Sequence, residues 1–167
     1  MDVFEGIYTR RSVRDFSGMP VEKEKLQEIL KAGSWAPSGL NNQPWRFAVV
    51  SGSEKRAELA GLTRYSRILL QAPVAIAVFA DHSAMYNDTK DQQAIGACIQ
   101  NMLLAAHALG LGAVWLGEIL KNAGAVRDVL ELSEHLELMA VLAVGYPDRN
   151  DQVSTRKMMP ELLVKEF

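Results

Sequence analysis

The chain has 167 residues, a length that fits one domain with a substantial buried core. Its formal net charge of -2 argues against a general attraction to nucleic acid or to an anionic membrane surface. A single cysteine excludes an internal disulfide framework, and the first residues lack the basic and then apolar layout of a secretion signal. We therefore expect one domain over residues 1–167 of a cytoplasmic protein, with no nucleic-acid partner and no membrane partner.

The first third of the chain predicts two helices and a rigid loop. Residues 2–9 have the spacing of a short amphipathic helix with Asp2 as its N-cap, and residues 22–33 have the spacing of a second helix. Between them, residues 10–16 contain three arginines, a serine and an aromatic side chain. From Trp35 to Trp45, two prolines, a glycine and several polar side chains predict a stiff loop.

The rest of the chain alternates strands and helices. Strands are predicted over 46–51, 73–80, 113–117 and 138–146, and helices over 54–70, 91–109 and 122–131. The helix over 91–109 is apolar and rich in small residues nearly all round, so in a short protein we expect a second subunit to cover it. This alternation predicts a three-layer α/β arrangement, but it does not fix the order of the strands.

The arginine cluster over residues 10–14 admits two interpretations. A basic run of this size can be a solvated loop between helices. Ser12 favours a phosphate partner instead, because guanidiniums bind phosphate oxygens in pairs and a hydroxyl adds a short neutral donor. The loop over 37–45 can likewise be a plain connector, or a frame in which Ser38, Asn41 and Gln43 bind the polar edge of a planar heterocycle.

Other motifs that would indicate chemistry are missing from the chain. Gly110 and Gly112 follow a predicted helix and precede a strand, the reverse of a dinucleotide-binding fingerprint. The three histidines and Cys98 have no metal-ligand spacing, and no nucleophile elbow or phosphate loop occurs. Any enzymatic chemistry is therefore expected to come from a bound cofactor.

Taken in order, these segments resemble the nitroreductase-like family of FMN-dependent oxidoreductases. The matching stretches are 10–16, 36–47, 100–101 leading into 110–112, 115–117, 145–147 and Arg156, so the likeness spans essentially the whole chain. The resemblance implies a three-layer α/β (α+β) fold whose central sheet is mainly antiparallel and flanked by helices. It also implies a domain-swapped homodimer with two FMN sites at the subunit interface.

The resemblance further implies which residues hold the flavin. The arginine cluster would bind the phosphate and the pyrimidine edge, the loop would come from the other subunit, and the tail would close on the phosphate. The implied cofactor-binding residues are Arg10, Arg11, Ser12 and Arg14 in the cluster, Pro37, Ser38, Gly39, Asn41 and Gln43 in the loop, Leu116, Gly117 and Glu118 after the third strand, and Arg156 and Lys157 in the tail. No side chain is expected to act as a catalytic base, because FMN would carry the chemistry.

The activity implied by the resemblance is that of an NAD(P)H oxidoreductase. NADH or NADPH would donate electrons, and a nitroaromatic, a quinone or a related small molecule would accept them, in two half-reactions through flavin N5. Two alternatives share the fold: an FMN enzyme with a specialised reaction, such as reductive dehalogenation, dehydrogenation or flavin fragmentation, and a flavin-binding protein without turnover. Residues 81–90 are the only stretch available to roof the flavin, so a short roof is expected.

Overall fold

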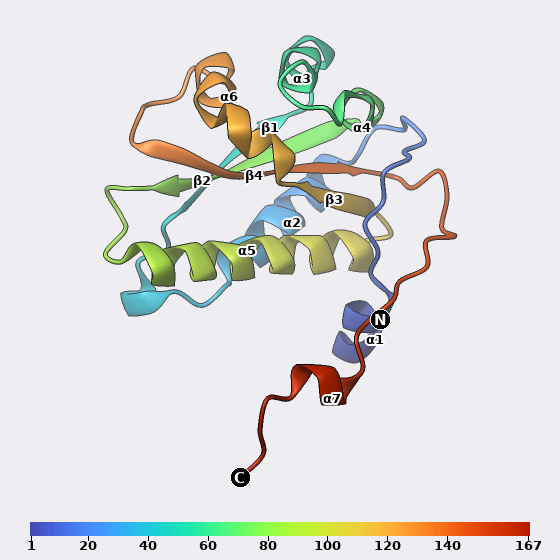
Figure 1. The fold of residues 1–167 in the computed structure, drawn as a ribbon. Coiled ribbons are helices and arrows are strands. Elements are labelled where there is room, and N and C mark those ends of the chain that lie inside the picture. The colour runs from blue at the N-terminus through green and yellow to red at the C-terminus, as the bar shows by residue number, and fades with distance from the viewer.

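The computed structural model of the protein describes all 167 residues and is built on one four-stranded sheet (Figure 1). The strands lie in the order β1-β2-β4-β3, and every neighbouring pair is antiparallel. Their bounds are Trp45–Val50 for β1, Val74–Asp81 for β2, Gly112–Leu116 for β3 and Leu136–Gly145 for β4. The sheet confirms the expected antiparallel arrangement and supplies the strand order that the sequence left open.

Helices cover both faces of the sheet, which gives the three layers expected (Figure 1). On one face lie α2 (Lys23–Ser34) and α5 (Asp88–Ala108), and on the other lie α3 (Ser53–Ala60), α4 (Ser66–Gln71) and α6 (Ala123–Val129). The side chains of β2 alternate between the two cores: Ile76 and Val78 belong to the α5 side, and Ala77 and Phe79 to the opposite side. Because both faces are covered, every residue of β2 is buried.

The predicted helix over 54–70 is wrong, because the structure divides it into α3 and α4. Gly61 ends α3, and the turn that follows contains Thr63, one of the few buried polar residues. The Thr63 hydroxyl donates a hydrogen bond of 2.6 Å to Glu118, which is 55 residues further along the chain. Apolar spacing continues across the break, so periodicity could not reveal a turn that a distant side chain holds.

The shorter helices lie near the chain ends and in the loops. Helix α1 (Val3–Thr9) begins at the predicted N-cap, where Asp2 and Glu5 form a reciprocal capping box. The remaining short elements are the 3-10 turns η1 (Gly39–Asn41) and η2 (Glu118–Asn122) and the helix α7 (Met159–Leu162). No helix combines the length and the apolar character that crossing a membrane would need.

The arginine cluster is attached to the sheet beside β3. Ser12 forms a parallel bridge with Ala113, and the Val13 N–H donates to the Ala113 carbonyl over 3.1 Å. Val13 and Phe16 are buried in the core, while the arginines between and before them point away from it. The apolar residues of this segment therefore fix its backbone and leave its guanidiniums outside the core, where those of Arg11 and Arg14 donate only to nearby backbone carbonyls.

Candidate functional site

The arginine cluster and the C-terminal tail meet around one cavity of about 240 Å³. The segment after α1 and the tail after β4 are more than 130 residues apart in the sequence, and both line this cavity. The lining residues are Arg10, Arg11, Ser12, Arg14, Gln152, Val153, Ser154 and Arg156. The structure thus brings together the predicted cluster and Arg156, whereas Lys157 is exposed and does not line the cavity.

The four arginines around this cavity have no carboxylate partner, unlike Arg46, Arg67, Arg127 and Arg149 elsewhere in the chain. The Nε atoms of Arg10 and Arg11 are buried without a hydrogen-bond acceptor. Burial lowers the pKa of Arg10, and the positive charges of Arg156 and Arg11 lower it further. Arginines that repel one another and have only uncharged acceptors, such as the carbonyls of Tyr8 and Ser12, form a site suited to an anion.

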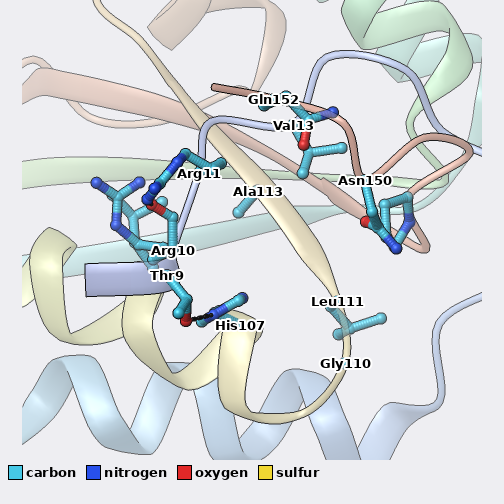
Figure 2. Close-up of a pocket in the computed structure, with 12 residues that line it drawn as sticks. Thr9, Arg10, Arg11, Val13, His107, Gly110, Leu111, Ala113, Asn150 and Gln152 are labelled. Atoms are coloured by element: carbon cyan, nitrogen blue, oxygen red, sulfur yellow. Dashed lines mark hydrogen bonds between the residues drawn. The ribbon is translucent and has the colours of Figure 1, made fainter. Parts of the chain in front are cut away.

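A second cavity of about 270 Å³ shares Arg10, Arg11 and Gln152 with the first (Figure 2). Its polar lining includes His107, from the last turn of α5, together with side chains of the tail. The residues that line this cavity are Thr9, Arg10, Arg11, Val13, Leu103, His107, Gly110, Leu111, Ala113, Pro147, Asn150 and Gln152. The sequence showed only that His107 has no metal-ligand spacing, and it did not link this residue to the cluster.

His107 faces the cluster as a neutral donor. The Thr9 hydroxyl donates its proton to the Glu5 carbonyl over 2.6 Å, so the 2.8 Å contact between Thr9 and His107 is a donation from the imidazole Nε2–H (Figure 2). Burial lowers the pKa of His107, and the charge of Arg10 lowers it further, which favours the uncharged ring. The imidazole therefore adds no positive charge to the cluster at neutral pH.

The loop between α2 and β1 has a strained and internally bonded backbone. Leu40, Asn41 and Gln43 all have positive φ angles, of 55°, 55° and 48°. Such conformations cost roughly 1–3 kcal/mol each for residues other than glycine, and surrounding contacts must impose them. The Ser38 hydroxyl accepts a hydrogen bond of 3.0 Å from the Gln43 N–H, and the Gln43 side chain donates to the Asn41 carbonyl over 3.2 Å. The side chains of Ser38 and Gln43 thus help to hold the loop.

One end of this loop is held by an ion pair at the end of the sheet. Arg46 contacts the buried carboxylate of Asp81 over 2.7 Å and donates to the carbonyls of Gln43 and Trp45 over 3.1 and 2.8 Å. The Asp81 N–H donates to the Pro44 carbonyl over 2.8 Å. The Ser83 hydroxyl and N–H, the charge of Arg46 and that of His135 hold the pKa of Asp81 below its usual value, so it stays ionised.

The third predicted segment lies at the end of β3. Leu116 is buried and Gly117 is exposed, with nothing within 4 Å of the position a Cβ would occupy. The Glu118 carboxylate pairs with Lys121 and accepts hydrogen bonds from the Thr63 hydroxyl and, over 3.1 Å, from the Arg64 N–H. These contacts, that of Lys121 first, lower the pKa of Glu118 to about 2. Its carboxylate is therefore ionised at neutral pH and anchors the turn after β3.

Within one chain, the loop and the arginine cluster lie towards opposite ends of α5 (Figure 1). A cavity beside Pro37, Ser38 and Gly39 is lined by α5 residues from Lys90 to Ala97, whereas the second cavity at the cluster is lined by Leu103 and His107. At 1.5 Å per residue, Ala97 and His107 are separated by about 15 Å along the helix axis. In a single chain, the loop residues and the arginine cluster are therefore too far apart to line the same cavity.

Comparison with known proteins identifies the family. The profile of the Nitroreductase family matches residues 7–64 and 61–146. The chain is 37% identical over 152 residues to a Methanothermobacter thermautotrophicus protein named as a candidate NADH dehydrogenase/NAD(P)H nitroreductase, covering 90% of this chain and 80% of that protein. It is 32% identical over 167 residues to the NADPH-flavin oxidoreductase of Vibrio harveyi, covering 93% and 70% of the two chains.

A solved structure agrees with these sequence matches. The crystallised relative comes from Desulfovibrio desulfuricans, is assigned as a nitroreductase and was solved in complex with FMN. It superposes on this chain with a TM-score of 0.95 and 48% sequence identity, covering 99% of this chain and 97% of the other. The agreement of profile, sequence and fold shows that the chain belongs to the nitroreductase family.

Proposed function

We propose that the protein is an FMN-dependent NAD(P)H oxidoreductase. The observation that carries the proposal is the set of four arginines without carboxylate partners around a cavity that also contains Ser12. A flavin phosphate carries a charge close to -2, and its oxygens accept the paired hydrogen bonds that guanidiniums donate. The buried and unpaired Nε atoms of Arg10 and Arg11 fit such an acceptor. The FMN complex of the Desulfovibrio desulfuricans protein and the name of the Vibrio harveyi relative support the choice of cofactor.

The residues of the cluster have separate roles in this proposal. Arg10, Arg11, Ser12 and Arg156 hold the phosphate, and the exposed Lys157 adds charge beyond the rim of the cavity. Arg14 lies two residues beyond Ser12, in the direction in which β3 leads to Leu116, and its charge favours the anionic reduced form of a flavin at the pyrimidine edge. Bound FMN supplies hydride acceptance from NAD(P)H at N5 and electron transfer to a small acceptor, a nitroaromatic or a quinone, in two half-reactions.

The remaining predicted residues shape the space for the ring. Leu116 and Gly117 leave an open surface at the end of β3, and Glu118 keeps that turn fixed through its bonds to Thr63 and Lys121. No side chain is needed as a base, because the protein contributes by binding and orienting the reactants. Pro37, Ser38, Gly39 and Asn41 line the ring from the loop, with Gln43 holding the loop in shape.

A homodimer unites the two groups of residues. Helix α5 keeps a stripe of partly exposed and mostly small or polar residues on the side away from the sheet: Gly96, Ala97, Gln100, Asn101, Leu104, Ala105 and Ala108. A twofold axis perpendicular to α5 would pack two such stripes together, and would set the N-terminal half of one helix beside the C-terminal half of the other. The loop of one chain would then approach the arginine cluster of its partner.

Exposed apolar side chains elsewhere support the same assembly. Trp35 is 79% exposed, and Phe4 on α1 is 67% exposed. The tail beyond Arg156 carries further apolar side chains with no cover, including Leu163 and Val164. Monomers rarely expose so much apolar surface, so we propose that the tail crosses to the partner in a domain-swapped homodimer.

The visible absorption of the purified protein, taken before and after NADH or NADPH is added without oxygen, tests the function. We expect a flavin spectrum, from bound or added FMN, that either nucleotide bleaches and a quinone or a nitroaromatic restores. A protein that neither carries nor takes up FMN would contradict the proposal. A flavin that neither nucleotide bleaches would favour a binding protein without turnover.

A further inference from the structure

Asp91 is the most deeply buried ionisable side chain near the loop. Only Thr63, Asp81 and Asp91 are buried polar or charged residues in this chain, and Asp91 is 0% exposed. Its Oδ1 accepts a hydrogen bond of 2.7 Å from the Asn42 side chain, and its Oδ2 accepts the backbone N–H groups of Tyr86 and Asn87 over 2.8 and 2.9 Å. Burial acts to raise the pKa of Asp91, but these hydrogen bonds keep it below its usual value. A buried carboxylate is thus held ionised by three donors.

These contacts join the loop to the connection between β2 and α5. The Asn42 amide also donates to the Ala84 carbonyl over 2.9 Å, so its side chain lies between that connection and Asp91. Asn42 itself has an ordinary backbone conformation but lies between residues of positive φ: Leu40 and Asn41 precede it and Gln43 follows it. The two hydrogen bonds of the Asn42 side chain, to Asp91 and to the Ala84 carbonyl, therefore act at the centre of the strained segment.

A simpler role for Asp91 would be to stabilise the start of α5 by its negative charge. That role needs neither burial nor a contact with Asn42, and Asp88, exposed in the first turn of the same helix, already provides such a charge. Asn87 also caps the helix, since its side chain accepts the Lys90 N–H over 3.0 Å. Burying a carboxylate is costly, and only the contacts to the loop and the connection require it.

We propose that Asp91 is a positioning residue that acts through Asn42 on the loop over 37–45 and holds its left-handed residues, Leu40, Asn41 and Gln43, in that conformation. Through the backbone of Tyr86 and Asn87, the same carboxylate fixes the connection over 82–87 against the loop. The proposal rests on the proposed function in one respect, namely that this loop lines FMN.

The contact between Tyr86 and Gly39 follows from this arrangement. A Cβ at position 39 would lie 2.6 Å from Cζ of the Tyr86 ring, so the ring occupies the space that the missing side chain leaves. The loop and the connection then form one rigid rim, and loss of the Asp91 carboxylate loosens both parts together.

Asp91→Asn and Asn42→Ala test the proposal, with Asp88→Asn as the matched control in the same turn of α5. In the cofactor-free protein, we expect both test variants to speed amide hydrogen exchange in residues 38–43, and Asp91→Asn to speed it in 84–87 as well. We also expect FMN affinity, measured by flavin fluorescence where each variant is folded, to fall about tenfold, as the loss of a hydrogen bond to a buried charge implies. The control should keep the exchange and the affinity of the wild type.

A folded Asp91→Asn or Asn42→Ala protein with wild-type loop exchange and wild-type FMN affinity would overturn the proposal, even with a lower melting temperature. If Asp91→Asn fails to fold, Asn42→Ala decides, because it keeps the carboxylate and its bonds to the helix start. If the wild type binds no FMN, the proposed function fails, while the exchange comparison still tests the anchor.

Discussion

Replacing Gly112 with alanine perturbs the attachment of the arginine cluster at a single point. A Cβ on Gly112 would lie 2.6 Å from Cβ of Val13 and 2.7 Å from both of its Cγ atoms. Gly112 has no positive φ, so the backbone of β3 accepts alanine and the new contact is the whole perturbation. Val13 is 6% exposed and lies between Arg11 and Arg14, so the collision acts directly on the segment that carries the guanidiniums.

The size of the effect follows from the overlap. Non-bonded carbons are most stable about 3.5–4.0 Å apart, so one side must move by roughly 1 Å. Because the β-branched Val13 has little rotamer freedom, the backbone of residues 12–14 must shift to relieve the contact. Such overpacking costs about 1–3 kcal/mol. For a chain of this size, that lowers the melting temperature by roughly 2–12 °C.

Thermal unfolding with and without FMN, together with FMN titration, measures both consequences. A shift of about 1 Å lengthens the phosphate hydrogen bonds beyond their useful range, so we expect FMN affinity to fall at least tenfold. Adding Val13→Ala to Gly112→Ala removes the collision and should recover part of the stability and of the affinity, in a double-mutant cycle. A Gly112→Ala protein with wild-type melting temperature and FMN affinity would refute this account of how the cluster is anchored.

Two further predictions concern charged residues. Arg10→Ala and Arg156→Ala should each weaken FMN binding by about tenfold or more, since each removes a charged hydrogen-bond donor from the proposed phosphate site. Equilibrium dialysis measures the affinity, with Arg127→Ala as the control. Unchanged affinity in both variants would mean that the phosphate binds elsewhere. The pKa of Glu118, lowered to about 2 from 4.5, implies a contribution to stability that is complete above pH 4.5 and is lost as the pH falls towards 2. The free energy of unfolding of Glu118→Gln, measured as a function of pH, should lack this loss between pH 4.5 and 2. A pH dependence of unfolding parallel to that of the wild type would contradict the prediction.

The local features of the fold were predictable because short-range chemistry determines them. The Asp2 cap, the strands and the long helix follow from capping residues and apolar spacing. The division between α3 and α4 was not predictable, because it depends on a hydrogen bond between Thr63 and the distant Glu118. Periodicity reports which face of a segment is apolar, but it does not report such tertiary contacts.

The candidate site was likewise predictable only in its local features. The arginine cluster and the polar loop stood out by composition, but only the family resemblance linked Arg156 to them. The anchoring residues gave no such signal: Asp91 reads as the first polar residue of a helix, and its partner Asn42 is 49 residues away. Gly39 was implied as a residue beside the flavin, and nothing in the sequence indicated that the Tyr86 ring fills the space where its side chain would lie.

The central claim is that each flavin site combines the arginine cluster of one chain with the loop of its partner. Flavin content of heterodimers made from two defective chains tests it most directly. One chain would carry Arg10→Ala and Arg156→Ala, and the other Ser38→Trp, which places a bulky ring on the loop. We predict that neither homodimer retains FMN, whereas the purified heterodimer binds one FMN with wild-type affinity, because one of its two sites is intact. A heterodimer as free of flavin as both homodimers would contradict the claim, since a site contained within one chain would be damaged in both subunits.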